Sequence, residues 1–294
     1  MDVRHILLAL TIAVMWGGNF IVTKWCVECI SPFTLIILRF VFSTFPLIFF
    51  IPRPKNISWG VLIALALTLG VGKFSFVFWS LKMGFAPGIG SLVLQTQVLF
   101  TVILSKFFLK TKISQKQAMG MVVAFFGMVA IAHEMGGDTN FLGFLCMLIG
   151  AFLWGVANVL FRKCQDANTF SLVIWMGIVP PLPLYGLSVM IDGPQAFFYE
   201  LSHINTMVIG QLIFIIVGAT WIGTTCWAYL FKKYDPGVVA PYGLLIPVVA
   251  VLLSWWFFDE THGWSGILGC VLVFLGLVIN QWSFKGKSAK LKAV

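Results

Sequence analysis

Residues 5–28 read HILLALTIAVMWGGNFIVTKWCVE. This run is apolar over the length that a helix needs to cross about 30 Å of hydrocarbon, for which roughly 20 residues suffice. It is too long for the apolar core of a secretory signal peptide, and it contains no small-residue cleavage pattern. We therefore expect it to form the first membrane-spanning helix.

Nine further apolar runs follow, separated by clusters of proline, glycine and charged residues. They cover residues 32–51, 58–82, 88–108, 115–133, 141–163, 168–191, 206–232, 237–257 and 264–283. Because the runs are continuous rather than alternating, they predict helices and exclude a transmembrane β-barrel. The expected fold is an all-α polytopic membrane protein with ten transmembrane helices.

The composition points the same way. Of the 294 residues, 60% are hydrophobic and 10% are charged, and the mean hydropathy is +0.99. Soluble domains have roughly 45–50% apolar and about 25% charged residues. The composition excludes a soluble enzyme, a disordered chain and a nucleic-acid reader, although the net charge of +9 would suit nucleic acid.

The distribution of the cations predicts the orientation. With ten spans, 15 of the 19 Lys and Arg residues fall on the side that holds the N-terminus. They are Arg4, Arg53, Lys55, Lys106, Lys110, Lys112, Lys116, Arg162, Lys163, Lys232, Lys233, Lys285, Lys287, Lys290 and Lys292. Cytoplasmic loops carry such an excess, so both termini are expected in the cytoplasm. Residues 285–294 are then a basic cytoplasmic tail that contacts anionic lipid.

The chain also shows an internal repeat. At a shift of 149 residues, Pro87-Gly88 matches Pro236-Gly237, and Gly120 and Gly127 match Gly269 and Gly276. Near the start of each half, Trp16-Gly17 with Asn19 resembles Trp154-Gly155 with Asn158. The predicted units are residues 1–135 and 136–284. Each unit has five spans, so the second is inverted relative to the first, as in many secondary transporters.

Several motifs resemble a known family. They are Trp16–Phe20 with Lys24, Leu38–Phe40, Phe45-Pro46, Arg53–Lys55, Gly90–Gln97, Gly120–Gly127, Ser171–Trp175, Val239–Pro241, Ile246–Val249 and Asp259-Glu260. Over nearly the whole chain they resemble the EamA group of the drug/metabolite transporter superfamily. Within it, the motifs near Trp16, Arg39 and Gln95 are most similar to the bacterial exporters of O-acetylserine and cysteine.

The resemblance implies a central cavity and the efflux of amino acids or related metabolites across the bacterial inner membrane. Two residues depart from the pattern. Leu109-Lys110 stands where similar members carry Gly-Glu, at the membrane edge. Lys73 stands where the similar exporters have a neutral polar residue, so it is a candidate for changing the charge of the preferred substrate.

Ionisable residues inside a membrane are costly and need an explanation. Counted from the outer ends of their spans at ~1.5 Å per residue, four polar side chains lie ~10–15 Å below the outer surface. They are Arg39, Lys73, Gln95 and Gln97. We expect a layer that binds a carboxylate or phosphate, with Arg39 as a bidentate partner and Lys73 as a point charge. The alternative is structural, with Arg39 on helix-end carbonyls and the glutamines bonded across helices.

Other candidate substrate-binding residues lie near the middle of their spans. Asn19 and Asn158 are costly in hydrocarbon unless they face a cavity or a partner. The remaining candidates are Trp16 and Trp154, whose indole N–H groups could face a pocket, Phe74, Phe78 and Tyr242 as aromatic lining, and Pro247, whose ring would free a backbone carbonyl. Core packing is the alternative for the aromatic residues, and a plain kink is the alternative for Pro247. The glycines of the repeat are expected to allow close helix packing rather than binding.

Other classes of function lack their signals. Metal ligands and catalytic residues are not expected, because the six cysteines are scattered and contain one lone CxxC, Cys26–Cys29. No nucleophile–base set supports an intramembrane enzyme, and no filter-like loop supports a channel. No Walker A motif is present, so ATP is not expected to drive transport. No cofactor is expected, and the chain is expected to be a monomer or weak dimer.

Three questions stay open at this stage. No Asp or Glu lies in the middle of any span, so a coupling proton would need an edge group such as Glu28 or Glu260, or the substrate itself. Gradient-driven facilitated export is the alternative. Import, and a larger substrate such as a nucleoside derivative stacked on the aromatic residues, also remain open.

Overall fold

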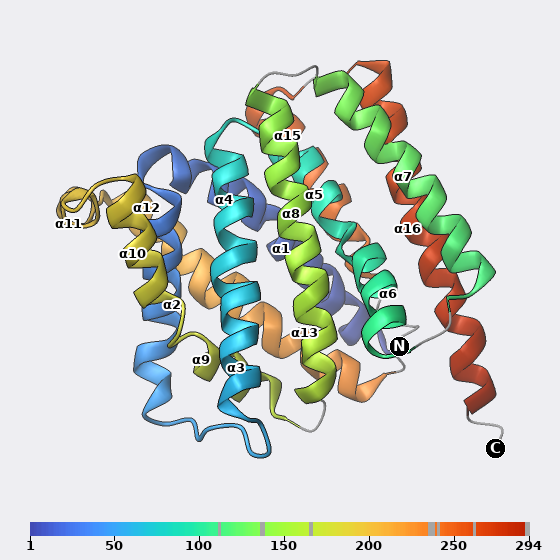
Figure 1. Ribbon diagram of the computed structural model, residues 1–294, viewed down its shortest axis with the longest axis horizontal. Coiled ribbons are helices and arrows are strands. Elements are labelled where there is room, and N and C mark those ends of the chain that lie inside the picture. The colour runs from blue at the N-terminus through green and yellow to red at the C-terminus, as the bar shows by residue number, and fades with distance from the viewer. Residues whose placement is uncertain are drawn as a thin grey trace.

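The computed structural model describes residues 1–110, 113–135, 139–164, 167–234, 239, 242–260 and 263–291. Throughout these ranges the regular secondary structure is helical. The helices pack side by side into one bundle, and the connections between them alternate between its two ends (Figure 1). The predicted all-α fold is therefore confirmed.

The first half of the chain begins with two uninterrupted helices. The elements of this half are α1 (Val3–Cys29), α2 (Pro32–Ile48), α3 (Trp59–Leu65), η1 (Ala66–Lys73), α4 (Phe74–Lys82), α5 (Pro87–Gln95), α6 (Gln97–Phe108) and α7 (Gln115–Met135). The segments α3, η1 and α4 run on as one rod, in which η1 is π-helical. Ser31 caps α2 by accepting a hydrogen bond from Phe33 N, and Pro32 occupies its first turn.

The second half is divided into more elements. Its elements are α8 (Thr139–Phe161), η2 (Arg162–Cys164), α9 (Thr169–Met176), α10 (Pro181–Ile191), α11 (Ala196–Ser202), α12 (Thr206–Ile213), η3 (Phe214–Ile222), α13 (Gly223–Lys233), α15 (Leu245–Phe258) and α16 (Trp264–Leu291). The segment η3 is π-helical, like η1. Asn168 and Asn205 cap α9 and α12 through their side-chain oxygens.

Seven helical segments are long and apolar enough to cross a membrane. Three shorter apolar helices, at Pro32–Ile48, Leu245–Phe258 and Trp264–Asn280, lie where three further spans are expected. The protein is therefore a multi-pass membrane protein, while the count of ten spans stays a prediction. Pro236-Gly237 and residues 292–294 lie outside the described residues, and α16 continues through most of the expected tail, to Leu291.

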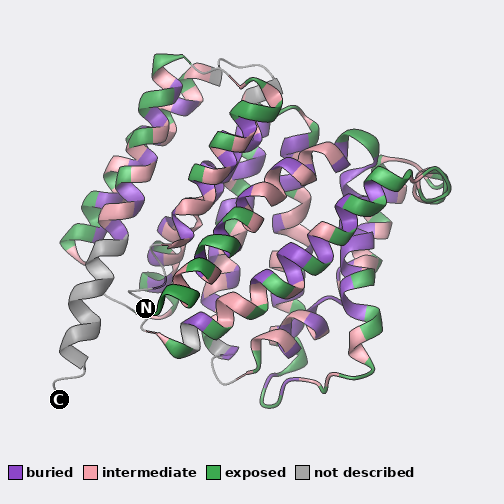
Figure 2. Ribbon diagram, turned by 180° about the vertical axis from the view of Figure 1, so that it is seen from behind, coloured by how far each residue is buried: buried purple, intermediate pink, exposed green. Residues whose placement is uncertain are grey.

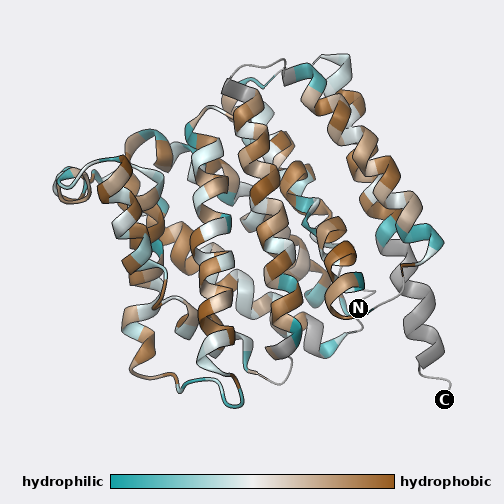
Figure 3. Ribbon diagram, viewed as in Figure 1, coloured by the Kyte–Doolittle hydropathy of each residue, from teal (hydrophilic) through white to brown (hydrophobic). Residues whose placement is uncertain are grey.

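Apolar side chains cover the outside of the bundle. Exposed positions occur along most helices, and many of them are hydrophobic (Figures 2 and 3). Phe107, Phe126, Leu182, Met190 and Trp256, for example, are each at least 60% exposed. A water-soluble monomer rarely exposes apolar surface on this scale, whereas a hydrocarbon environment accepts it.

Glycines bring α7 and α16 into contact. A Cβ atom on Gly120 would lie 2.6 Å from the Gly276 carbonyl oxygen, and one on Gly127 would lie 2.8 Å from the Gly269 oxygen. Real Cβ atoms essentially never come so close to backbone atoms. The prediction that these four glycines permit close helix packing is confirmed.

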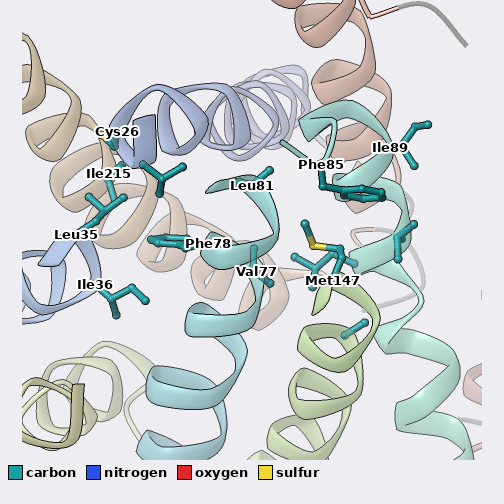
Figure 4. Close-up of a cluster of buried hydrophobic side chains, with 14 of the residues drawn as sticks. Cys26, Leu35, Ile36, Val77, Phe78, Leu81, Phe85, Ile89, Met147 and Ile215 are labelled. Atoms are coloured by element: carbon teal, nitrogen blue, oxygen red, sulfur yellow. The ribbon is translucent and has the colours of Figure 1, made fainter. Parts of the chain in front are cut away.

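The main core lies around α4. In Figure 4, Val77, Phe78 and Leu81 of α4 meet buried side chains from other helices, among them Leu35 of α2 and Met147 of α8. This core packs α4 against α2 of the first half and α8 of the second half. The N-terminal end of α4, where it joins η1, also borders the cavity described next.

Candidate functional site

A cavity of about 200 Å³ lies among helices of both halves. Its lining comes from α1, α2, η1, α4, α5, α8, η3, α13 and α15. Eight of the residues predicted as site residues line it: Trp16, Asn19, Arg39, Lys73, Phe74, Phe78, Gln95 and Trp154. The other four predicted residues, Gln97, Asn158, Tyr242 and Pro247, lie outside this lining.

Arg39 and Lys73 dominate the electrostatics of the cavity. Each side chain is only 8% exposed. The Arg39 Cζ atom lies 4.3 Å from the centroid of the Phe74 ring, and Lys73 Nζ lies 3.6 Å from the same centroid. Lys73 Nζ also lies 4.9 Å from the Trp154 ring. The aromatic faces partly stabilise both cations, because the face of an aromatic ring is electron-rich.

Local structure places these two cations. Arg39 lies on α2 and donates a hydrogen bond from Nη2 to the Thr220 hydroxyl of η3, at 3.0 Å. The Thr220 hydroxyl in turn donates to the Ile215 carbonyl within the π-helix. Lys73 is the last residue of the π-helix η1, so the backbone of η1 sets the direction of its side chain. Short π-helical segments occur frequently at functional sites.

In the described part of the chain, neither cation has a carboxylate partner. Among the described residues, Arg39 and Lys73 form no ion pair, and none of the described lining residues is Asp or Glu. The Arg39 Nη1 atom has no hydrogen-bond partner, and neither do the buried oxygens Asn19 Oδ1 and Thr23 Oγ1. Buried polar atoms are normally satisfied, so these unpartnered atoms leave hydrogen-bonding groups in the cavity for water or a ligand.

Trp16 is the cavity-lining residue nearest the N-terminal end of α1. Its indole Nε1 donates to the Ala219 carbonyl oxygen at 2.8 Å, and its ring lies 5.4 Å from that of Trp227. The predicted availability of the Trp16 N–H is therefore wrong, because this group is already paired. The other aromatic lining packs edge to face, with the Phe74 and Phe78 rings 5.5 Å apart.

Gln95 and Gln97 have different environments. Gln95 ends α5, lines the cavity and donates from Nε2 to the Gly243 carbonyl oxygen at 3.2 Å. Gln97 begins α6 and accepts a hydrogen bond from Asn158 Nδ2 of α8. Asn158 Nδ2 also donates to Thr101 Oγ1 at 3.0 Å. The pair Gln97–Asn158 thus joins two helices, as the structural alternative proposed.

Tyr242 and Pro247 lie beside the cavity lining rather than in it. Tyr242 packs against a separate cluster that contains Ala9, Ile12 and Leu230. Pro247 is buried in the first turn of α15, and the carbonyl four residues before it, that of Gly243, accepts the hydrogen bond from Gln95 Nε2. The neighbouring Ile246 lines the cavity instead.

Ten lining residues were not predicted from sequence. They are Phe20, Thr23, Leu69, Val77, Leu81, Ser91, Leu94, Ala219, Thr224 and Ile246. Helical spacing could have found some, since Thr23 lies one turn from Asn19 and Leu69 lies one turn before Lys73. The sequence carries no comparable signal for Ala219 and Thr224, because their position at the cavity depends on how η3 and α13 pack.

Metal chemistry has no support in the described residues. No group of three His, Cys, Asp or Glu side chains among them could hold a metal ion. The six cysteines are all free, and Cys26 donates a hydrogen bond to Gln211 Oε1 of α12. The cavity is thus defined by cations, neutral polar groups and aromatic rings.

Comparisons with known proteins are consistent with this arrangement. The model of the EamA-like transporter family matches the chain twice, at residues 3–132 and 141–281. A probable amino-acid metabolite efflux pump of Escherichia coli K12 is 34% identical over 288 residues, which are 96% of each chain. A protein of the same name from Salmonella typhimurium is also 34% identical, over 95% of each chain.

More distant proteins also match nearly the whole chain. An uncharacterized transporter of Archaeoglobus fulgidus is 26% identical over 94% of this chain and 98% of its own length. A chain of known crystal structure superposes with a TM-score of 0.60 at 17% identity, covering 95% of this chain and 98% of that chain. At that identity the superposition concerns the fold alone.

Proposed function

The chain belongs to the EamA-like transporter family, and we propose that it exports amino acids or related small metabolites, of the cysteine or O-acetylserine kind. Membership makes it a small-molecule transporter of the membrane. We also propose that the direction is export across a bacterial inner membrane, with both termini in the cytoplasm. The relatives named as efflux pumps support the direction, and the distribution of Lys and Arg supports the orientation.

The observation that carries this proposal is the cavity with its two unpaired cations. Arg39 and Lys73 can bind a carboxylate that enters the cavity, because each presents N–H donors there without a carboxylate partner among the described residues. A buried carboxylate needs such charged partners. No described arrangement of side chains suggests a catalytic step, so we propose transport rather than catalysis.

We propose that transport uses alternating access of two inverted five-helix repeats, residues 1–135 and 136–284. Three observations support this. The family model matches twice, the cavity is lined from both halves, and the π-helices η1 and η3 occupy corresponding places in the third and eighth predicted spans. Substrate sites of inverted-repeat transporters lie at such an interface.

In the proposed orientation, contacts between α1 and the region of α13 lie on the cytoplasmic side of the cavity. The lining residues of α1 run from Trp16 to Thr23, in its outer half. Toward the cytoplasmic end, the Trp16–Trp227 contact is followed by the Tyr234 hydroxyl, which lies 2.9 Å from His5 Nδ1. Export would require these contacts between α1 and the region of α13 to open in the inward-facing state.

A nucleoside derivative is less well supported. The cavity is smaller than the ~300–1,000 Å³ typical of sites for drug-sized ligands. The Phe74 ring, which could stack on a base, already lies against two cations. A small amino-acid metabolite fits this volume and charge better.

Counterflow in liposomes tests the proposal. Purified protein would be reconstituted in vesicles loaded with cysteine, O-acetylserine, an aromatic amino acid or one nucleoside derivative, with and without a proton gradient. Exchange of labelled cysteine or O-acetylserine is expected. Exchange of the nucleoside derivative alone would keep the transporter but overturn the proposed substrate. A change with the gradient would indicate proton coupling, and inside-out vesicles would separate export from import.

A further inference from the structure

We propose that the cavity selects a small metabolite with two acidic groups and a net negative charge, such as an acidic amino acid, over a neutral zwitterion. This inference rests on the proposed export of amino acids or related metabolites, and within that class it places acidic members ahead of the neutral cysteine and O-acetylserine. It follows from the charges, the free donors and acceptors, and the size of the site.

The charge of the cavity favours two acidic groups. Arg39 and Lys73 are both about nine-tenths buried, and no Asp or Glu occurs among the described lining residues. A zwitterion with one carboxylate would compensate one cation and bring an ammonium close to the other. A molecule with two acidic groups compensates both, which the low dielectric of the interior makes strongly favourable.

The geometry offers one donor to each acidic group. Arg39 and Lys73 lie against the same Phe74 ring, with their charged centres 4.3 and 3.6 Å from its centroid. Arg39 Nη2 donates to the Thr220 hydroxyl, and Nη1 has no hydrogen-bond partner among the described residues. Lys73 Nζ also has no hydrogen-bond or ion-pair partner among the described residues. The two cations are thus close enough for one compact molecule and still free to donate.

Neutral acceptors on α1 serve the remaining polar group of such a molecule. Asn19 Oδ1 and Thr23 Oγ1 lie one helical turn apart, line the cavity and have no partner. They can accept hydrogen bonds from the amino or hydroxyl group of an acidic metabolite. They supply no negative charge, so they do not offset the repulsion that an ammonium meets from Arg39 and Lys73 when only one carboxylate is present.

Aspartate and asparagine provide a matched pair, because they have nearly the same shape and differ by one charge. We expect aspartate to compete in counterflow at a concentration about tenfold or more below that of asparagine, the scale of one charge-assisted hydrogen bond. A change in the total tryptophan fluorescence, to which Trp16 and Trp154 at the cavity contribute, gives an independent measure of binding. Succinate tests whether the two acidic groups suffice without an amino group.

A single substitution tests whether the charge of Lys73 causes the preference for aspartate over asparagine. Lys73→Gln is expected to weaken aspartate binding about tenfold or more and to leave asparagine within about twofold. Lys82→Gln is the matched control, since Lys82 is exposed on the same helix and outside the cavity lining. The Lys82→Gln substitution should change the binding of neither aspartate nor asparagine.

The outcomes are distinct. Equal or better exchange of asparagine by the unmodified protein would overturn the inference and leave the proposed export of amino acids standing. Exchange of succinate without any amino acid would support selection of two acidic groups and contradict amino-acid export. If none of these ligands binds or exchanges and cysteine does, the inference fails. If cysteine and O-acetylserine fail as well, the proposed function fails with it.

Discussion

Arg39 of α2 and Thr220 of η3 join the two halves of the chain at the cavity, through a hydrogen bond of 3.0 Å from the guanidinium to the hydroxyl. The two residues lie 181 positions apart in the sequence. Both are buried at 8% exposure, and Thr220 itself is outside the cavity lining. Thr220 therefore acts as a positioning residue for Arg39 rather than as a contact for the substrate.

Thr220→Val removes this acceptor while keeping the branched shape of the side chain. We expect the apparent affinity for carboxylate substrates to fall about two- to tenfold, because one hydrogen bond to a charged group is lost. The maximal exchange rate and the thermal stability in detergent should change little. Thr11→Val is the matched control, because the exposed Thr11 hydroxyl also donates to a carbonyl of its own helix, far from Arg39. A fall in rate without a change in affinity would contradict the positioning role.

Arg39→Ala removes the guanidinium itself. Counterflow of carboxylate substrates is expected to fall about 10- to 100-fold, on the scale of a charge-assisted contact. The protein should remain folded, because the Thr220 hydroxyl keeps its bond to the Ile215 carbonyl and no carboxylate loses a partner. Arg4→Ala at an exposed position near the N-terminus is the control. Undiminished transport by a folded Arg39→Ala variant would rule out an anion-binding role for Arg39.

The sequence predicted the two cations of the site because charges are rare in apolar spans. Their depth followed from counting residues from the span ends, and both line one cavity. The sequence did not reveal the π-helices η1 and η3, since no residue pattern distinguishes them from α-helix. Those segments determine where Lys73 and Thr220 point, so the partner of Arg39 could not be predicted.

Helical geometry explains why Gln95 and Gln97 separate. Two residues apart, they lie ~200° apart around a helix, so one cavity cannot easily receive both. The chain is also interrupted at Thr96, between α5 and α6. The repeat suggested equal roles for Asn19 and Asn158, yet only Asn19 reaches the cavity. The two halves differ in the neighbours of each asparagine, which a repeat in the sequence does not specify.

Close packing of α7 against α16 predicts a steric effect on stability. Gly120→Val would place a side chain against the Gly276 carbonyl and the Asn280 backbone, so the helices must separate. We expect a loss of about 1–3 kcal/mol or more, seen as a lower unfolding temperature in detergent. Gly186→Val in α10 is the control, because a Cβ atom there meets nothing within 4 Å. Equal stability of the two variants would disagree with the observed approach of α7 and α16.

The two asparagines of the repeat predict opposite effects. Asn158→Ala breaks the bonds to Gln97 and Thr101, so stability should fall by about 0.6 kcal/mol, and by no more than ~1.7 kcal/mol, the range for hydrogen bonds between membrane helices. Its substrate affinity should be unchanged, because Asn158 is outside the cavity lining.

Asn19→Ala is the reciprocal experiment. Asn19 Oδ1 lines the cavity without a partner, so its removal should weaken substrate binding about two- to tenfold at unchanged stability. Each variant controls for the other when ligand binding, followed by the change in tryptophan fluorescence, and thermal unfolding are measured on the same preparations. A loss of affinity in Asn158→Ala with none in Asn19→Ala would place the substrate on the α6–α8 side. The cavity beside Arg39 and Lys73 would then not be the binding site.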